Sequence, residues 1–208
     1  VLGVDRLDYS KGLEERLLAY ERFLTDHPDR RRDVFMLQIS THTRSDVEEY
    51  QDISSRLDAL SGRINGAFAE MDWIPVRNVH RPHARDELAG IYRAADVCLV
   101  TPLRDGMNLV AKEFIAAQSE EDPGVLVLSR FAGAASQMKQ ALIVNPFSQE
   151  DVADAISRAL RMELSERRER WRALHKGVME DDVVAWRDAF VKVLQDVAKP
   201  RKVDNAAA

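Results

Sequence analysis

The sequence has 208 residues, of which 45% are hydrophobic and 31% charged, a composition that fits one large globular domain or two small ones. The formal net charge of −5 argues against nucleic acid or an anionic membrane as the main partner. Cys98 is the only cysteine and lies in an apolar run, so we expect a small buried hydrophobe, no disulfide framework and a cytoplasmic location. No apolar run is long enough to cross a bilayer, and we expect no signal peptide.

Apolar runs of strand length alternate along the chain with stretches in which apolar residues recur at helical spacing. We predict strands over residues 1–4, 34–40, 73–76, 96–100, 124–129 and 141–146. We predict helices over residues 13–27, 46–60, 84–93, 109–117, 149–162, 165–176 and 181–197. Strands that alternate with helices in this way predict an α/β fold with a doubly wound parallel sheet.

The chain shows no internal repeat, low-complexity tract or linker, so we expect one domain over residues 1–197 and a disordered tail over residues 198–208. Because the chain does not begin with Met and opens inside a predicted strand, we expect it to be a piece of a longer protein. Ser45 and Glu48 form a capping-box pattern at the start of the second helix. The tryptophans are predicted to pack in the core or at a domain interface: Trp73, Trp171 and Trp186.

The polar turn at residues 101–108 lies between a predicted buried strand and a predicted helix. Ligands bind at the carboxyl ends of the strands in open α/β sheets, and the free N–H groups of the next helix suit an anion. We expect Gly106 to permit a positive φ and close backbone approach, and Glu113 to be a buried carboxylate that sugar hydroxyls could satisfy. The alternative is an ordinary strand–turn–helix in which Asp105 and Glu113 are simply solvated.

A second polar loop follows the first strand. It carries Arg6 and Lys11, five residues apart, and Gly12 at the start of a helix. Cations and helix N–H groups at a strand end suit a diphosphate, although two basic residues in a loop are more often exposed surface residues that bind no ligand. The Walker and dinucleotide-binding glycine patterns are both missing. A basic loop at one strand end and an acidic turn with Glu113 at another together predict a nucleotide-sugar site.

These two loops, at residues 4–12 and 101–113, closely resemble those of the trehalose-6-phosphate synthases, which are retaining glycosyltransferases with two Rossmann-like domains, the GT-B architecture. The resemblance covers the chain to about residue 194 and continues through residues 62–66, 124–128, 131–135 and 141–146. It implies that this chain is the C-terminal, donor-binding half of such an enzyme. The N-terminal Rossmann-like domain, which supplies much of the acceptor site, would then be a missing partner.

The resemblance also implies a role for each matching residue. Arg6 and Lys11 would hold the donor's diphosphate and neutralise the leaving group, and Asp105 would bind the transferred glucose. The rest of the implied donor site runs along the turn and the next helix: Gly106, Met107, Asn108, Leu109, Val110, Ala111, Lys112 and Glu113. In this set the backbone of residues 106–108 would hold sugar hydroxyls, the amides of residues 109 and 110 would face phosphate, and Glu113 would bind the ribose.

Two implied roles fall outside these loops. Arg44 matches an arginine that binds the acceptor's phosphate, and His83 lies near the nucleobase pocket. His83 stands where the family more often has a large aromatic or apolar residue, and Ser40-Thr41 replaces an expected Ala-Pro, so UDP and GDP both remain open for the donor. His80 and His83 do not predict a metal site, because the intervening proline breaks the helix that would align them.

The implied reaction transfers glucose, with retention, from a nucleoside-diphosphate glucose to glucose 6-phosphate and gives trehalose 6-phosphate. Negative charge that grows on the leaving diphosphate would be stabilised by Arg6, Lys11 and a helix N-terminus, without the paired carboxylates of a retaining glycosidase. One alternative is a pseudoglycosyltransferase acting on cyclitols. Met107 favours the sugar enzyme over this alternative, because it keeps the loop that is usual in the family. The other is a non-catalytic sugar-nucleotide-binding domain, which the intact polar residues disfavour. No cofactor is expected, and a homo-oligomer stays open.

Overall fold

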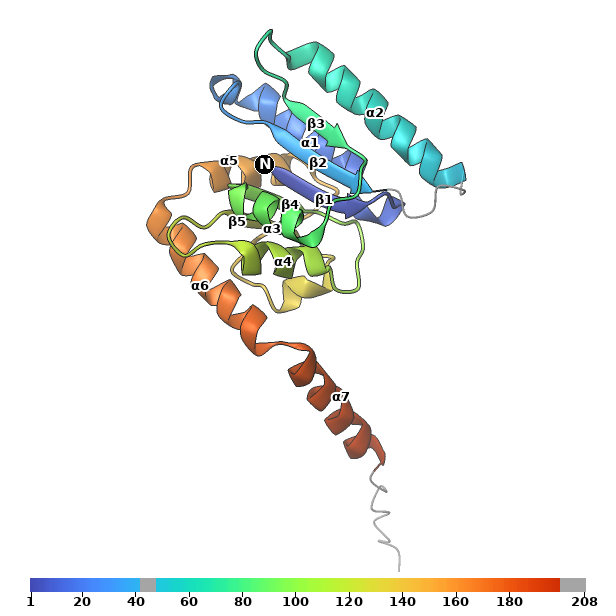
Figure 1. Cartoon of the computed structure of the whole chain (residues 1–208), viewed down its shortest axis with the longest axis vertical. Helices are drawn as coiled ribbons and strands as arrows, with labels where there is room; N and C mark the ends of the chain where they lie inside the picture. Colours follow the sequence, from blue (N-terminus) through green and yellow to red (C-terminus); the bar gives the residue numbers. More distant parts are fainter. Residues whose placement is uncertain (42–47, 199–208) are drawn as a thin grey trace, which may run out of the picture.

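The computed structural model describes residues 1–41 and 48–198 of the chain, so Arg44 and the predicted cap at Ser45 lie outside the described residues. The described residues form a six-stranded sheet in the order β3-β2-β1-β4-β5-β6, with every neighbouring pair parallel (Figure 1). The strands are β1 (Leu2–Arg6), β2 (Met36–Thr41), β3 (Val76–Val79), β4 (Val97–Val100), β5 (Val125–Ser129) and β6 (Leu142–Val144). The predicted α/β fold with a parallel, doubly wound sheet is confirmed.

Helices cover both faces of this sheet. They are α1 (Leu13–Asp26), α2 (Glu48–Phe68), α3 (Arg85–Ala94), α4 (Leu109–Ala117), α5 (Gln149–Leu160), α6 (Leu164–Glu180) and α7 (Val183–Ala198). Successive strand residues point to opposite faces. In β4, Val97 and Leu99 pack in a cluster with α1, α2 and α5, whereas Cys98 and Val100 pack with α3, α4 and α6. The predicted burial of Cys98 is therefore confirmed.

The strand order reverses between β1 and β4. From β1 the chain adds β2 and β3 on one side, and it then returns to place β4, β5 and β6 on the other. The loops that leave the carboxyl ends of β1 and β4 therefore start side by side and diverge, which is the position where open α/β sheets bind ligands. These are the two loops that carry most of the predicted site residues.

The predicted strand at residues 73–76 is misplaced, because β3 begins only at residue 76. Trp73 instead closes a turn through an isolated antiparallel bridge with Glu70. Pro75 has no N–H to donate, and its carbonyl accepts from the amide of Met36 at 2.7 Å. The ladder with β2 consequently starts after the proline. Apart from the second helix, the remaining predicted elements are found with their ends shifted by a few residues.

The second helix is longer than predicted, since α2 continues to residue 68 and not only to residue 60. Gly62 and Gly66 lie inside it, at positions where a Cβ would meet no atom within 4 Å. Ile64 is fully buried, and the side chain of Asn65 bonds both the amide (3.0 Å) and the carbonyl (2.9 Å) of Val76. These tertiary contacts outweigh the low helix propensity of glycine.

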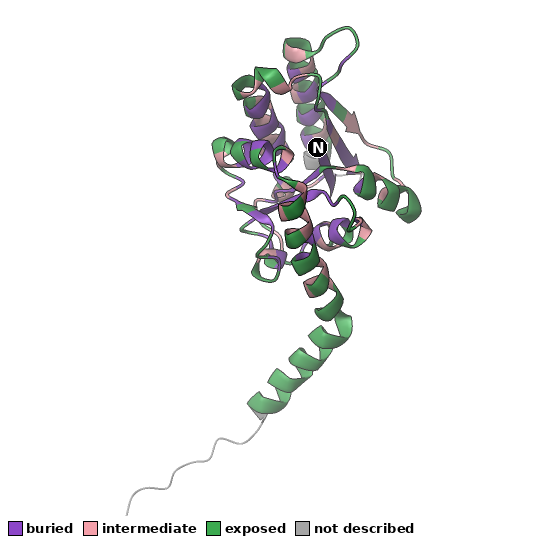
Figure 2. Ribbon diagram, turned by 90° about the vertical axis from the view of Figure 1, so that its left-hand side faces the viewer, coloured by how far each residue is buried: buried purple, intermediate pink, exposed green. Residues whose placement is uncertain are grey.

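Helix α6 packs on α4, and α7 then leads away from the body of the sheet (Figures 1 and 2). Trp171 on α6 is buried and its Nε1 donates to the carbonyl of Ile115 at 3.0 Å, so its predicted packing is confirmed, as is that of Trp73. Residues 183–197 of α7 are all exposed. Trp186 is 61% exposed, so its predicted packing in the core is wrong, whereas its packing at a domain interface stays a prediction. No helix in the described part of the chain is both long and apolar enough to cross a membrane.

Candidate functional site

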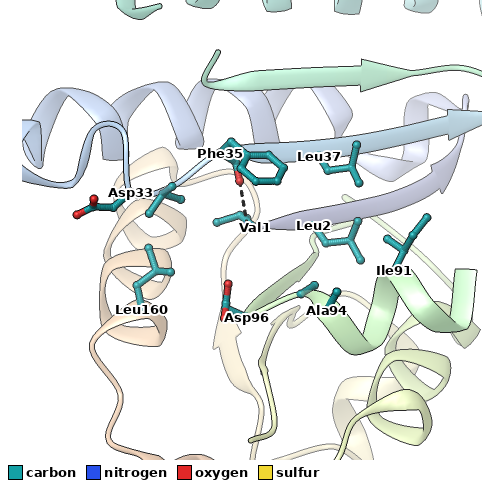
Figure 3. Close-up of a pocket in the computed structure, with 11 residues that line it drawn as sticks. Val1, Leu2, Asp33, Phe35, Leu37, Ile91, Ala94, Asp96 and Leu160 are labelled. Carbon is teal, nitrogen blue, oxygen red and sulfur yellow. Dashed lines mark hydrogen bonds between the residues drawn. The ribbon is translucent and has the colours of Figure 1, made fainter. Parts of the chain in front are cut away.

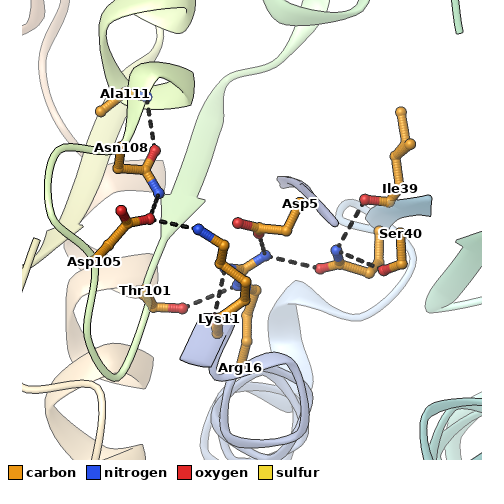
Figure 4. Close-up of polar contacts among 10 residues, drawn as sticks. Asp5, Lys11, Arg16, Ile39, Ser40, Thr101, Asp105, Asn108 and Ala111 are labelled. Atoms are coloured by element: carbon orange, nitrogen blue, oxygen red, sulfur yellow. Dashed lines mark hydrogen bonds and ion pairs between the residues drawn. The ribbon is translucent and has the colours of Figure 1, made fainter. Parts of the chain in front are cut away.

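The loops that follow β1 and β4 are joined at the carboxyl edge of the sheet. The carbonyl of Ser10 accepts from the amides of Leu103 (2.8 Å) and Arg104 (3.3 Å). Lys11 Nζ donates to Asp105 Oδ2 at 2.6 Å, and the two residues are 94 positions apart in the sequence (Figure 4). The basic loop and the acidic turn that the sequence predicts as partners therefore meet in one place.

The Asp105 carboxylate is surrounded by donors. Besides Lys11, Asn108 Nδ2 donates to it at 3.0 Å and the amide of Met107 at 3.4 Å. Partial burial acts to raise the pKa of Asp105, but these hydrogen bonds and the charge of Lys11 outweigh that effect, so its pKa lies below the ordinary value for Asp. The ionised carboxylate can accept further hydrogen bonds from the hydroxyl groups of a ligand.

The turn takes its positive φ at Asn108, where φ is 76°, and the expectation that Gly106 supplies it is wrong. Asn tolerates the left-handed region better than most residues, and the side chain of Asn108 caps α4 by accepting from the amide of Ala111 at 3.3 Å. The close backbone approach falls on Gly133, where an added Cβ would lie 1.9 Å from the carbonyl oxygen of Gly106.

Gly133→Ala should lower the free energy of unfolding by about 1–3 kcal/mol, because the new methyl group must displace the backbone of Gly106. Gly62→Ala is the matched control. It adds the same methyl group within α2 where nothing is in the way, and it should stabilise the chain by about 0.5–1 kcal/mol. Urea unfolding of both variants measures the difference. A Gly133→Ala variant as stable as the unmodified chain would contradict the packing described.

The start of α4 lies at the same edge. The amides of Leu109 and Val110 are among the first N–H groups of a helix, which have no partner within it. Lys112, also predicted for the donor site, turns elsewhere, because its Nζ donates to the carbonyl of Asp181 at 3.2 Å. The structure therefore places the first amides of α4 at the carboxyl edge of the sheet, and the ammonium group of Lys112 at the junction of α6 and α7.

A cavity of about 300 Å³ opens beside this corner, between the ends of β1 and β2 and the helices α3 and α4. Its walls include Arg6, His83 and Glu113, which the sequence predicts for the donor site, and Val110 from the first turn of α4. Arg6 is exposed at the end of β1. The lining of the cavity thus combines charged residues of both signs with apolar residues.

Glu113 is exposed, so its predicted burial is wrong. Glu113 lies on the side of α4 that faces the cavity, whereas its neighbours Phe114 and Ile115 pack into the core. Glu113 Oε2 accepts from the hydroxyl of Tyr92 at 3.3 Å. Burial, with the charge of Glu113 adding to it, raises the pKa of Tyr92, so the phenol remains a donor. The sequence interpretation missed Tyr92, since nothing in its helical pattern separates it from a core residue.

The family of the chain follows from comparison with known proteins. The model of glycosyltransferase family 20 matches residues 1–196. This chain belongs to glycosyltransferase family 20.

Relatives in this family share the fold at high sequence identity. A trehalose-6-phosphate synthase of Sinorhizobium fredii is 50% identical over 93% of this chain and 42% of its own length. A solved structure described as "Trehalose-6-phosphate from E. coli bound with UDP-2-fluoro glucose" is 47% identical, with a TM-score of 0.90. A UDP-forming alpha,alpha-trehalose-phosphate synthase from Burkholderia xenovorans, in complex with glucose-6-phosphate, is 53% identical with the same TM-score. Each structure is matched over 93% of this chain and 43% of its own, so the chain spans less than half of these relatives.

His83 is held inside the cavity wall of this family 20 chain. Its side chain is only 5% exposed, and Nδ1 lies 2.8 Å from Glu87 Oε1. Neither ring nitrogen has a partner in hydrogen-bond geometry among the described residues. Because Glu87 lies beside Nδ1, Nε2 is the ring nitrogen on this cavity wall that is open to a polar ligand atom.

A buried ion pair that the sequence interpretation missed lies under the family 20 site. Arg16 on α1 is fully buried and pairs with Asp5 of β1, with 2.7 Å between Nη1 and Oδ2. Burial raises the pKa of Asp5, and the charge of Arg16 opposes this rise. The available signal was position: Arg16 is three residues after Leu13 and four before Tyr20, on the apolar face of the helix.

A second hollow, of about 250 Å³, lies at the opposite, amino edge of the sheet (Figure 3). Its walls are mainly apolar, with Asp33 and Asp96 as the charged side chains, and the amino group of Val1 donates to the carbonyl of Phe35 at 3.0 Å. No Lys or Arg side chain is among the described residues that line it. The described part of the chain also contains no group of three or more His, Cys, Asp and Glu that could hold a metal ion.

Proposed function

We propose that this chain is the donor-binding part of a trehalose-6-phosphate synthase, which transfers glucose with retention from a nucleoside-diphosphate glucose to glucose 6-phosphate. The observation that carries the proposal is the meeting of the basic loop with the acidic turn, where Lys11 Nζ lies 2.6 Å from Asp105 Oδ2 beside the cavity that Arg6 and Glu113 border. Membership of family 20 and the similarity to trehalose-6-phosphate synthases support it.

In this proposal the site works by electrostatics and positioning. Arg6, Lys11 and the first amides of α4 bind the diphosphate, whose negative charge grows as the glycosyl–phosphate bond breaks. Asp105 and the backbone of residues 106–108 hold the glucose, and Glu113 binds the ribose hydroxyls. Loss of one donor to the developing charge typically raises the barrier by about 2.7–4 kcal/mol. A leaving-group oxygen accepts the proton of the incoming hydroxyl on the same face of the sugar.

The partners proposed for this site follow the same logic. We infer that the donor carries uridine, because the E. coli structure holds UDP-2-fluoro glucose and the Burkholderia xenovorans enzyme is UDP-forming. His83 would then lie near the base. The acceptor glucose 6-phosphate would be bound by Arg44 and by an N-terminal Rossmann-like domain of a longer chain. The free, buried Cys98 fits a reducing compartment, so we propose a cytoplasmic location.

Calorimetric titration of this chain with UDP-glucose and with GDP-glucose, in the presence of EDTA, tests the proposal. We expect binding without a metal ion, and tighter binding of UDP-glucose. The same chain mixed with UDP-glucose and glucose 6-phosphate should form no trehalose 6-phosphate, because the acceptor half is missing. Failure of both nucleotides to bind would contradict the proposed site, and tighter binding of GDP-glucose would contradict the choice of uridine.

A further inference from the structure

One fully buried side chain connects the strand ends beneath the site. The guanidinium of Arg16 donates from Nη1 to Asp5 Oδ2 (2.7 Å) and Gln38 Oε1 (3.1 Å), which belong to β1 and β2 (Figure 4). It also donates from Nε to Thr101 Oγ1 at 2.9 Å, directly after β4, and from Nη2 to the carbonyl of Lys11 at 3.5 Å. Arg16 therefore contacts both loops of the candidate site from below.

Stability alone does not account for a charge in this place. Two buried ions lose their hydration, and a buried ion pair is often no more stable than well-packed apolar side chains of the same volume. The sheet also makes room for the pair: a Cβ on Gly3 would lie 2.6 Å from Arg16 Nη1 and 2.3 Å from Gln38 Oε1. Gly3 thus leaves space in the strand for the guanidinium of Arg16. We take this as a sign that Arg16 serves to position the loops around it.

We propose that Arg16 is a positioning residue of the candidate site, which fixes the Lys11 loop against the Asp105 turn and so sets the distance between the two side chains that a sugar diphosphate would contact.

Two features of the backbone give Arg16 this control. Gly12, at a φ of 63°, lies against the end of β4, where an added Cβ would be 2.7 Å from the carbonyl oxygen of Thr101. The bond from Arg16 to Thr101 closes the same junction from inside. Along β1, Val4 packs on the face of the sheet that α3 and α4 cover, and side chains alternate between the two faces. Asp5 is therefore on the opposite face and Arg6 on the same face as Val4. Asp5 is held toward α1, which leaves Arg6 on the face that carries the cavity.

Thr101→Val tests this role, because it keeps the shape of the side chain and removes the acceptor for Arg16 Nε. A carbon NMR titration follows the carboxyl of Asp105, assigned with Asp105→Asn, and calorimetry measures binding of UDP. We expect the pKa of Asp105 to rise toward the ordinary Asp value and UDP binding to weaken by about fivefold, the equivalent of one hydrogen bond. Thr101→Ser restores the hydroxyl and should restore both measurements.

Trp73→Phe is the control for simple destabilisation, since it also removes a buried hydrogen bond, from Trp73 Nε1 to the carbonyl of Val34 at 3.1 Å. It should lower the melting temperature without changing either measurement. A folded Thr101→Val chain with an unchanged Asp105 titration and unchanged UDP binding would overturn the proposal. If Thr101→Val does not fold, Gln38→Met replaces it, because it removes the acceptor that Gln38 offers to Arg16 Nη1. A raised pKa of Asp105 with weaker UDP binding would support the proposal, and no change in either would overturn it.

The UDP measurement rests on the proposed function, whereas the Asp105 titration does not. If the unmodified chain binds neither UDP nor GDP, the proposed function is wrong. The titration then still decides whether Arg16 positions Lys11 against Asp105.

Discussion

Arg6→Ala and Lys11→Ala should each weaken the binding of UDP to this chain by at least about tenfold. A hydrogen bond to a charged group contributes about 1.5–3 kcal/mol, and each 1.4 kcal/mol corresponds to about tenfold in affinity. Lys11→Ala should have the larger effect, because it also leaves the carboxylate of Asp105 without its cation at 2.6 Å. Calorimetric titration of both variants at one fixed salt concentration measures the loss.

Exposed cations elsewhere on the molecule provide the controls. Arg56→Ala removes an arginine of α2 that pairs with Glu14, and Lys176→Ala removes a lysine of α6 that pairs with Glu180. Both change the net charge as the test variants do, and both should leave UDP binding unaltered. Undiminished binding in Arg6→Ala and Lys11→Ala alike would remove the basis for a diphosphate site at this edge.

Asp5→Asn should lower the free energy of unfolding of this chain by about 3–5 kcal/mol, since it leaves the fully buried charge of Arg16 without a counterion. The amide keeps the shape of the carboxylate, so the loss reports on charge and not on a cavity. Urea denaturation, followed by circular dichroism, gives the difference between the two chains.

Asp26→Asn is the matched control, because Asp26 also pairs with an arginine of α1, Arg22, but at the surface. Exposed pairs of this kind contribute about 0.3–0.5 kcal/mol, so this variant should unfold almost as the unmodified chain does. Equal losses in the two variants would show that Asp5 and Arg16 are far better solvated than the structure indicates.

Local patterns were enough to predict the two loops that meet at the candidate site. The apolar run of β4, the polar turn after it and the helical spacing of α4 are all encoded by neighbouring residues, as is the basic loop after β1. The rule that strand ends bind ligands then brings Lys11 and Asp105 together, and they are in contact. Short-range sequence signals and one topological rule therefore predict the contact between the two loops of the candidate site.

The errors concern properties that depend on distant neighbours. Gly106 was expected to supply a positive φ and close backbone approach, but the positive φ lies at Asn108 and the crowded position is Gly133, which packs against Gly106 from the loop after β5. Burial of Glu113 could not be judged without knowing which side of α4 faces the sheet. The position of Arg16 on the apolar face of its helix hinted at burial, but its partner Asp5, in the strand beside it, is known only from the structure. Each of these requires the three-dimensional packing.

The contact between Lys11 and Asp105 also bears on selectivity toward small ions. Inorganic phosphate or sulfate would have to pull the ammonium group from a counterion 2.6 Å away and would leave that carboxylate facing another negative charge. In the proposed complex, a sugar diphosphate would compensate both groups, with phosphate oxygens for the lysine and hydroxyl groups for the aspartate. Asp105 would then compete with small anions for Lys11, so that this site would discriminate against free phosphate and in favour of a sugar diphosphate.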